Sequence, residues 1–393
     1  MTSQANKNIY KFQGFYFFAF LGFGSLAPLL GVYMSEVEKL NGYQIGTILS
    51  IGPIIMIFFQ PVWGMLADVR KSPNQLLTWT TLIAGVCGLG YILLSNYYWF
   101  FAVSILVAVF QSAIIPLSDS ISLKYTSKMK VSYGNVRMFG SLGFGIAVFM
   151  MGRLSEYNPA VIFYAFFLAL SSAALLSLRL PVEVAGGQGK LWAGMKGLLK
   201  HKKFIVFLLV TFLIFGPNLA NNFYFGLFVE DRGGTYTGIG IAFLIAVLSE
   251  IPFMRAAASW INKIGLLQVA LLGGAVSVVR WVFYFTEPGL WLIYSSAVIQ
   301  GFSLGLFIPA GLQYVRDITP VRMTATAVTL YSAIGNGLGN WFSTFFGGII
   351  FEEYGIAVVY LFFSLLSLLG VLSLVWLLQQ EKRSSPAIHL PSK

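Results

Sequence analysis

Long apolar runs, separated by short polar hinges, follow one another along the whole chain. Twelve runs are recognisable, at about residues 12–34, 45–66, 76–95, 99–122, 136–154, 161–180, 204–229, 238–259, 265–285, 290–314, 324–350 and 356–378. A helix of about 20 apolar residues is long enough to cross the hydrocarbon core of a bilayer, which is about 30 Å thick. The pattern therefore predicts an all-α membrane protein with twelve transmembrane helices.

The hinge between the sixth and seventh runs divides these helices into two groups of six. It covers residues 181–203 and reads PVEVAGGQGKLWAGMKGLLKHKK, with a glycine-rich core that is typical of a flexible linker. Two sets of six spans are typical of transporters built from two structural repeats around a central cavity. We therefore expect two pseudo-symmetric six-helix halves, residues 1–180 and 204–380, joined by a basic cytoplasmic linker at 181–203 and followed by a cytoplasmic tail at 381–393.

The composition excludes a soluble protein. Of the 393 residues, 57% are hydrophobic and 10% are charged, whereas soluble domains contain about 25% charged residues. The net charge of +11 does not indicate nucleic-acid binding, because the lysines and arginines lie mostly in short hinges between the apolar runs. Their distribution instead carries information about topology.

The basic residues favour one side of the predicted bilayer. If the N-terminus is cytoplasmic, the outer loops contain only Lys39, Arg153 and Arg232, and the other hinges and tails hold nearly all remaining lysines and arginines. The outer loops instead collect acids, which are Glu36, Glu38, Glu156, Glu230, Asp231, Glu287, Glu352 and Glu353. Because loops rich in lysine and arginine stay in the cytoplasm, we expect both termini to be cytoplasmic and the protein to be a multi-pass protein of a bacterial cell membrane.

Residues suited to metal or redox chemistry are scarce. Cys87 is the single cysteine, and the two histidines, His201 and His389, fall in the linker and the tail. No spacing of His, Cys, Asp and Glu is typical of a metal site. The sequence therefore predicts no metal, no cofactor and no enzymatic activity.

Two acids and two arginines that lie well within the predicted spans or in the hairpin between the fourth and fifth are the first candidates for function. Asp119 and Arg137 belong to the first half, and Glu250 and Arg280 belong to the second. A charge in the hydrocarbon core costs several kcal/mol, so such residues mark substrate or ion pathways by default. We expect these four to bind substrate or to couple transport to protons, although Asp119 and Arg137 could instead form a structural ion pair between spans 4 and 5.

Glu250 is the candidate for a proton carrier. It lies about 18 Å along its helix from the outer end, close to the middle of the membrane. Burial raises the pKa of a carboxyl and a nearby arginine lowers it, so a carboxyl that alternates between such surroundings can take up and release a proton. Arg280 lies a little past halfway along the next span, and a Glu250–Arg280 pair across adjacent helices is plausible.

Amide side chains within the spans are candidates for polar residues lining the cavity. Asn218 and Asn222 lie in span 7, Gln300 in span 10 and Asn336 in span 11. Each could instead bond to a neighbouring helix, at about 1 kcal/mol. Spans 5 and 11 are also rich in glycine, which indicates either ordinary close helix packing or surfaces on which the two halves rock; the glycines are Gly140, Gly143, Gly145, Gly335, Gly337 and Gly339.

The hinge after span 2 reads GMLADVRK at residues 64–71 and resembles the loop motif of the major facilitator superfamily. Gly64, Leu66, Ala67 and Asp68 match the motif, whereas Lys71 stands where it has a second glycine. The resemblance implies an inner gate formed by Gly64, Asp68 and Arg70, with Arg322 near the start of span 11 as the partner of Asp68.

The hairpin at residues 115–145 looks like the corresponding stretch of lactose permease and of phenylpropionate permease-like transporters. The sharpest match is the run Tyr133-Gly134-x-x-Arg137-x-x-Gly140. The resemblance implies that Asp119 and Arg137 contact substrate and that Phe144 occupies the position of the tryptophan that stacks on sugar in lactose permease. The sequence LGLFIP at residues 304–309 lacks the histidine and glutamate that lactose permease uses for proton coupling, which puts lactose in doubt as the substrate.

Together these features predict a secondary active transporter of the major facilitator superfamily. We expect a monomer in the lipid bilayer that moves a small organic solute, namely a sugar, a nucleoside or an aromatic acid, as a proton symporter by alternating access. A proton-coupled drug antiporter is the alternative, since one fold can serve both directions. A receptor or scaffold without transport activity is the alternative of another class, and no soluble domain beyond the linker and the tail supports it.

Overall fold

The computed structural model describes residues 3–69, 73–131, 133–181, 198, 200–320 and 323–384. In the first half the helices are α1 (Ser3–Glu36), α2 (Gly42–Val69), α3 (Pro73–Gly88), its 3₁₀ continuation η1 (Leu89–Ile92), α4 (Tyr97–Lys128), α5 (Gly134–Ser155) and α6 (Val161–Ser177). In the second half they are α8 (Lys202–Asp231), α9 (Tyr236–Ile264), α10 (Leu266–Phe285), α11 (Leu290–Asp317), α12 (Thr324–Ser332), η3 (Ala333–Gly339), α13 (Asn340–Tyr354) and α14 (Ile356–Ser384).

These helices confirm the predicted all-α membrane fold. Within the described residues, ten helices are long and apolar enough to cross a membrane, and α6 is a shorter apolar helix. The path from α12 through η3 to α13 supplies the remaining predicted span without a break in the helical chain. Most of the predicted linker lies outside the described residues, and so does the end of the tail.

The interruption of this last span has a local cause in the sequence. The segment η3 is a π-helix with the sequence AIGNGLG, and π-helical turns occur mostly as single-turn bulges within α-helices. Its glycines allow close approach of the backbone of α8, since a Cβ added at Gly216 would lie 2.5 Å from the carbonyl oxygen of Gly339. The π-helical segment η3 thus lies at a point where this span packs very closely against α8.

The two halves meet mainly through three helix pairs. These are α2 with α13, α5 with α9, and α1 with α8. Within the second half, α9 packs against α11, and α11 packs in turn against α10. The helices α9 and α10 also touch each other, but less extensively than each touches α11, and no ion pair joins Glu250 to Arg280 among the described residues.

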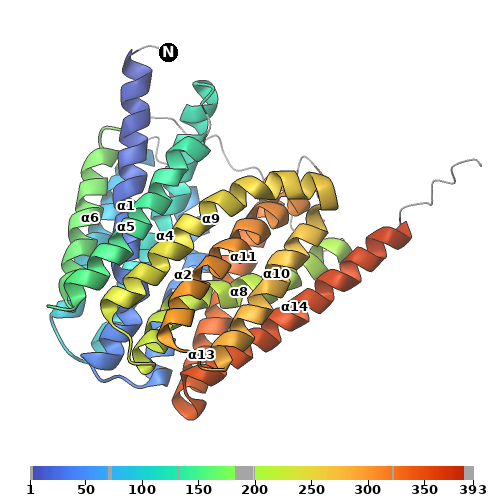
Figure 1. The fold of residues 1–393 in the computed structure, drawn as a ribbon. Coiled ribbons are helices and arrows are strands. Elements are labelled where there is room, and N and C mark those ends of the chain that lie inside the picture. The colour runs from blue at the N-terminus through green and yellow to red at the C-terminus, as the bar shows by residue number, and fades with distance from the viewer. Residues whose placement is uncertain are drawn as a thin grey trace, which may run out of the picture.

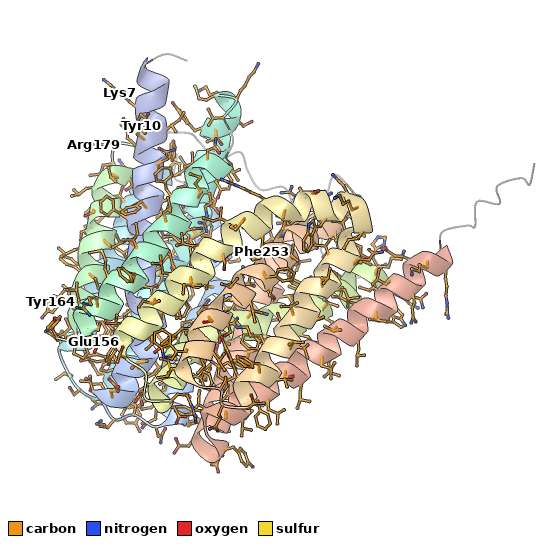
Figure 2. All side chains as sticks on the ribbon, viewed as in Figure 1. Lys7, Tyr10, Glu156, Tyr164, Arg179 and Phe253 are labelled. Atoms are coloured by element: carbon orange, nitrogen blue, oxygen red, sulfur yellow. The ribbon has the colours of Figure 1, made fainter. Side chains whose placement is uncertain are left out.

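We name the two ends of the bundle by their charged residues. The acidic face holds the ends of α1, α5, α8 and α13, with Glu36, Glu156, Glu230 and Glu352, and the basic face holds the start of α1 and the end of α4, with Lys7 and Lys128. Figure 2 labels Lys7 at one end of the bundle and Glu156 toward the other. In Figure 1 the two halves converge toward the acidic face and spread apart toward the basic face, where the N-terminus lies.

Close contacts between the halves lie toward the acidic face. A Cβ added at Gly46 of α2 would lie 2.5 Å from the Cα of Gly348 in α13. Toward the other end of α2, Gly64 has nothing within 4 Å of such a Cβ, and the side chain of Phe58 is 65% exposed. Along α2, the close contact between the halves thus lies toward the acidic face.

The glycines of spans 5 and 11 lie at two kinds of helix contact, some within one half and others between the two halves. Gly140 and Gly143 lie against α1, within the first half. Gly145 lies opposite Leu244 of α9, and Gly337 lies against Ile57 of α2, so these two glycines are at contacts between the halves.

Candidate functional site

Asp119 on α4 is held by tyrosines of its own half. Its Oδ1 accepts hydrogen bonds from the hydroxyl of Tyr16 on α1 at 2.6 Å and from the hydroxyl of Tyr133, at the start of α5, at 2.7 Å. The Tyr16 hydroxyl is also 2.8 Å from Ser122 Oγ. Hydrogen bonds to an ionised carboxylate are stronger than neutral ones, so this arrangement fixes the carboxylate without a cation.

Arg137 on α5 is half-buried and lies on the face of an aromatic ring. Its guanidinium carbon is 4.0 Å from the ring centre of Phe20 and 5.6 Å from that of Tyr16. A Cβ added at Gly140 would lie 2.7 Å from Arg137 Nη1, so the glycine leaves the space that the guanidinium occupies. No ion pair between Asp119 and Arg137 is found among the described residues. The structure therefore does not support the structural ion pair that the sequence left open.

Glu250 on α9 brings an acid from the second half to this cluster. Its backbone packs against Gly301 and Gly305 of α11, and its carboxyl is near enough to the guanidinium of Arg137 for a Coulomb attraction between them. An acid of one half and an arginine of the other therefore lie within Coulomb range of each other.

Arg280 on α10 lies apart from these three residues, inside the second half. Its side chain is 1% exposed, and its Nη2 donates to Gln300 Oε1 at 2.7 Å while its Nε donates to the Tyr284 hydroxyl at 3.2 Å. Asn221 Nδ2 donates to the same Gln300 oxygen at 3.4 Å and Asn221 Oδ1 accepts from the Tyr360 hydroxyl at 3.1 Å. This is a buried polar network, with Arg280 Nη1 lacking a partner among the described residues.

The predicted cavity amides take different positions. Gln300 belongs to the Arg280 network, and Asn218 is buried and donates to Ser277 Oγ at 3.0 Å. Asn222 is half-buried, and Asn336 is exposed and donates to Ser332 Oγ at 2.8 Å. Asn218 and Gln300 thus bond within the second half, which agrees with the packing alternative.

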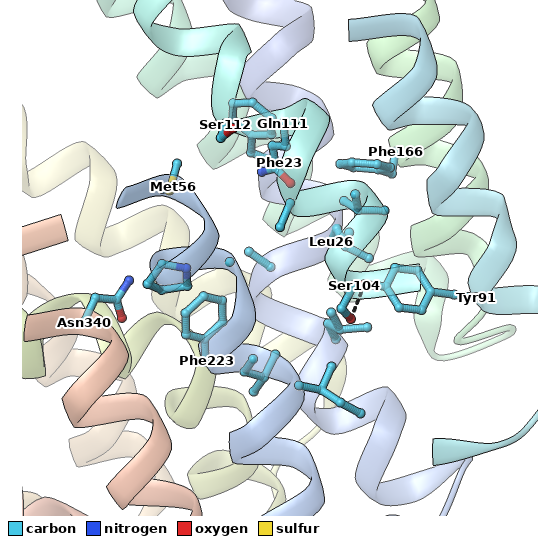
Figure 3. A pocket seen from close by; sticks show the side chains of 18 residues that line it. Phe23, Leu26, Met56, Tyr91, Ser104, Gln111, Ser112, Phe166, Phe223 and Asn340 are labelled. Carbon is cyan, nitrogen blue, oxygen red and sulfur yellow. Dashed lines mark hydrogen bonds between the residues drawn. The ribbon is translucent and has the colours of Figure 1, made fainter. Parts of the chain in front are cut away.

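A cavity of about 220 Å³ lies among α1, α2 and α4 of the first half (Figure 3). Its walls are mostly apolar and come from α1, α2, η1, α4 and α6, with Phe223 of α8 and Asn340 of α13 added from the second half. Gln111 of α4 lines it and is labelled in Figure 3 on the side where Phe23 lies. The ring centres of Phe20, over which Arg137 lies, and of Phe23, which lines the cavity, are 5.3 Å apart.

Other predicted residues are less well placed by the structure. Phe144 is half-buried on α5, and its carbonyl oxygen lies against Gly24 of α1. Of the inner-gate residues, Gly64 stands in open space, whereas Arg70, Arg322 and the side chain of Asp68 lie outside the described residues. Among the residues that the structure describes, no group of three His, Cys, Asp or Glu side chains could hold a metal ion.

Sequence reasoning missed the residues that hold the charged cluster. Tyr16 and Phe20 lie on one face of α1, four residues apart, and they contact Asp119 and Arg137. The chain has 36 phenylalanines and 19 tyrosines, so their type alone did not distinguish them. Tyr133 carried a signal, because it opens the same short run that contains Arg137.

Known proteins similar to this chain are transporters. Residues 9–362 match the model of the MFS_1 like family. The uncharacterized transporter YwbF of Bacillus subtilis is 48% identical over 99% of this chain and 98% of its own length. The maltose permease of Geobacillus stearothermophilus is 47% identical over 94% of this chain and 95% of its own length.

A solved structure shows the same fold. The crystal structure of the nucleoside transporter NupG superposes with a TM-score of 0.82, over 94% of this chain and 99% of its own. The sequence identity is 19%, so this likeness concerns the fold alone.

Proposed function

Because this chain belongs to the MFS_1-like family of the major facilitator superfamily, we propose that it takes up a sugar of the disaccharide class together with a proton, by alternating access across the bacterial cell membrane. The acidic face is then the outer side, and both termini are cytoplasmic. The positive-inside distribution of lysine and arginine supports this orientation. The chain is a transporter and not an enzyme, because its relatives and structural neighbours are transporters.

The observation that carries this proposal is the cluster of Asp119, Arg137 and aromatic rings in the first half. Arg137 lies over the Phe20 ring and within Coulomb range of Glu250 of the second half, while Tyr16 and Tyr133 donate hydrogen bonds to Asp119. Guanidinium and carboxylate groups supply donors and acceptors for hydroxyl groups, and aromatic rings supply apolar faces for a pyranose ring. Such a combination suits a neutral polyhydroxylated solute.

The neighbouring cavity supports a solute longer than one ring. Asp119 and the cavity residue Ser112 are seven residues apart on α4, which corresponds to about 10 Å along the helix. That length is comparable to two linked sugar rings. We assign one ring to the Asp119–Arg137 cluster and the second to the cavity, where Gln111 and Asn340 offer amide groups from both halves.

The relative with a named sugar points in the same direction. The maltose permease is 47% identical over nearly the whole of both chains, far above the 23% of the probable 3-phenylpropionic acid transporter of Escherichia coli. An exporter of organic cations is disfavoured, since the positive charge of Arg137 lies within Coulomb range of the Glu250 carboxyl.

In this scheme Glu250 carries the proton. When it is protonated its attraction to Arg137 is lost, which frees the guanidinium for the solute, and deprotonation restores the attraction. We place Arg280 behind the transport path, where it orients Gln300, and we place the gate motif Gly64, Asp68, Arg70 and Arg322 at the cytoplasmic side.

Transport by proteoliposomes tests the proposal. We expect labelled maltose to accumulate when the lumen is alkaline, and a protonophore to abolish this accumulation. Glucose, a nucleoside and 3-phenylpropionate serve as competitors of other classes. Counterflow of a nucleoside with no counterflow of any disaccharide would contradict the assignment of substrate.

The Glu250→Gln variant tests the proton carrier separately. Glutamine keeps the size of the side chain but cannot take up and release a proton as a carboxyl does. We therefore expect maltose counterflow to continue while accumulation driven by the pH gradient is lost. Glu353→Gln on the acidic face is the matched control and should accumulate maltose as the parent does. Full accumulation by Glu250→Gln would exclude Glu250 as the carrier.

A further inference from the structure

Two helices begin at the acidic face with a hydrogen bond to an acid of the opposite half. The N–H of Gly42, the first residue of α2, donates to Glu352 Oε2 of α13 at 2.7 Å. The N–H of Thr237, the second residue of α9, donates to Glu156 Oε1 at the end of α5 at 2.9 Å. The first four N–H groups of a helix have no partner within the helix, so both acids satisfy groups that need an external acceptor.

The two contacts are equivalent in the two halves. The helices α2 and α9 are the second spans of their halves, and α5 and the α12–η3–α13 path are the fifth. Each helix also has a local cap that serves a different N–H group, with Asn41 Oδ1 accepting from Gln44 N and Thr235 Oγ1 accepting from Gly238 N. The acids therefore bond N–H groups that the local caps do not serve.

Both acids stand where their own helices disfavour a negative charge. Glu352 is in the last turn of α13, and Glu156 is the residue at which α5 ends. The C-terminus of a helix carries partial negative charge and the N-terminus carries partial positive charge. Each acid is thus unfavourably placed with respect to its own half and favourably placed only when the other half is in contact.

A glycine crossing lies directly below each contact. Gly46 and Gly348 touch about one turn from the Gly42–Glu352 bond, and a Cβ added at Gly152, four residues before Glu156, would lie 3.1 Å from the Cα of Gly240. The bare backbones let the helices come close enough for the acids to reach the opposing N–H groups.

We propose that Glu156 and Glu352 are a symmetric pair of latches that hold the acidic face closed by binding the N-termini of α9 and α2, and that they thereby set the balance between the two orientations of the transporter. Opening of the acidic face separates the halves, breaks both hydrogen bonds and returns each carboxylate to the C-terminus of its own helix. The proposal requires only that the chain is an alternating-access transporter, and it does not depend on the identity of the solute.

Distances between spin labels on the acidic face test the latches. In a Cys87→Ser background, labels at Tyr98→Cys in the first half and Trp291→Cys in the second occupy side chains that are 78% and 84% exposed. We expect the labelled protein that retains Glu156 and Glu352 to show mainly the short label-to-label distance of the closed acidic face. Each of Glu156→Gln and Glu352→Gln should raise the ratio of long to short distances about tenfold, in line with the loss of a charge at a helix N-terminus.

The matched control is Glu353→Gln. Glu353 is adjacent to Glu352 in the same turn, is exposed, and makes no hydrogen bond that we find in the described part of the chain, so its change should leave the distance distribution as it was. An unchanged distribution in the double variant Glu156→Gln/Glu352→Gln would overturn the proposal, and so would an equal shift in Glu353→Gln.

A second measurement needs no variant at all. Amide hydrogen exchange of the unmodified protein should show Gly42 and Thr237 protected together in the closed state, since each N–H is bonded across the interface. Fast exchange at both positions, with the rest of the acidic-face helices protected, would also refute the latches. A failure of maltose transport would leave these two readouts unaffected, which separates this proposal from that of the substrate.

Discussion

Replacement of Gly46 by alanine should shift the transporter away from the closed acidic face. The added Cβ would lie 2.5 Å from the Cα of Gly348, 3.0 Å from its backbone nitrogen and 3.0 Å from the Tyr224 hydroxyl. Ordinary contacts of a Cβ begin at 3.4 Å, so α2 and α13 would have to separate by roughly the difference, about 1 Å. Forced overpacking of this kind costs about 1–3 kcal/mol.

The crossing exists only when the acidic face is closed, so this cost falls on one of the two states. A destabilisation of 1–3 kcal/mol corresponds to about a 5- to 150-fold change in the ratio of the two orientations. The spin-label pair at positions 98 and 291 reports that ratio directly. Gly348→Ala perturbs the same crossing from α13, since its Cβ would lie 2.6 Å from the Cα of Gly46. It should change the ratio of the two orientations by the same factor.

The control for this prediction lies on the same helix. A Cβ added at Gly52 has nothing within 4 Å, so Gly52→Ala should leave the spin-label distance distribution unchanged. Because Gly52 lines the cavity, this variant serves as a control for the distance measurement and not for transport. Since the two crossing glycines share one contact, the effects of Gly46→Ala and Gly348→Ala should not add. A lowered melting temperature in Gly46→Ala with no change in the distance distribution would refute the reasoning, because the contact would then be equally needed in both orientations.

Two further predictions concern the polar networks of the halves. Tyr16→Phe and Tyr133→Phe each remove one hydroxyl that donates a hydrogen bond to Asp119. Because a hydrogen bond to a charged group contributes about 1.5–3 kcal/mol, each variant should raise the half-saturating concentration for maltose counterflow about tenfold or more. An unchanged value would show that Asp119 is not part of the solute site. Arg280→Met removes a buried cation that no described acid pairs with. Because burial of an unpaired charge costs free energy, the melting temperature should hold or rise, while counterflow should fall because Gln300 is no longer oriented. A large fall in melting temperature would contradict this prediction.

The sequence predicted the helices well because one physical requirement dominates them. In the bilayer every backbone polar group must be bonded within the protein, so each apolar run of sufficient length becomes a helix, and the observed helices follow the predicted runs. Even the glycine-rich run at residues 324–350 remained one span, although its π-helical turn at Ala333–Gly339 was not foreseen.

The pairing of side chains could not be read in the same way. Glu250 and Arg280 lie on consecutive helices, which made their pairing plausible, yet both helices pack mainly against α11, Arg280 bonds to Gln300 and Tyr284, and the acid is within Coulomb range of Arg137 of the other half. Which helices touch is decided by packing in three dimensions, and consecutive order along the chain does not determine it. The acids of the outer loops were informative for topology alone, and nothing in their spacing indicated that Glu156 and Glu352 reach the N-termini of distant helices.

The distribution of hydrogen bonds explains how the two halves can move as units. Asp119 is bonded by Tyr16 and Tyr133 of its own half, and Arg280 is bonded by Gln300 and Tyr284 of its own half. Between the halves, Glu156 and Glu352 make two hydrogen bonds to helix N-termini. Because these two are the hydrogen bonds that join the halves at the acidic face in the described residues, a rocking motion of the halves would break few polar contacts, while the networks inside each half would keep Asp119 and Gln300 in place. A solute that bridges the halves at Arg137 and Glu250 can then bias the balance with only the free energy of its own binding, as an alternating-access carrier requires.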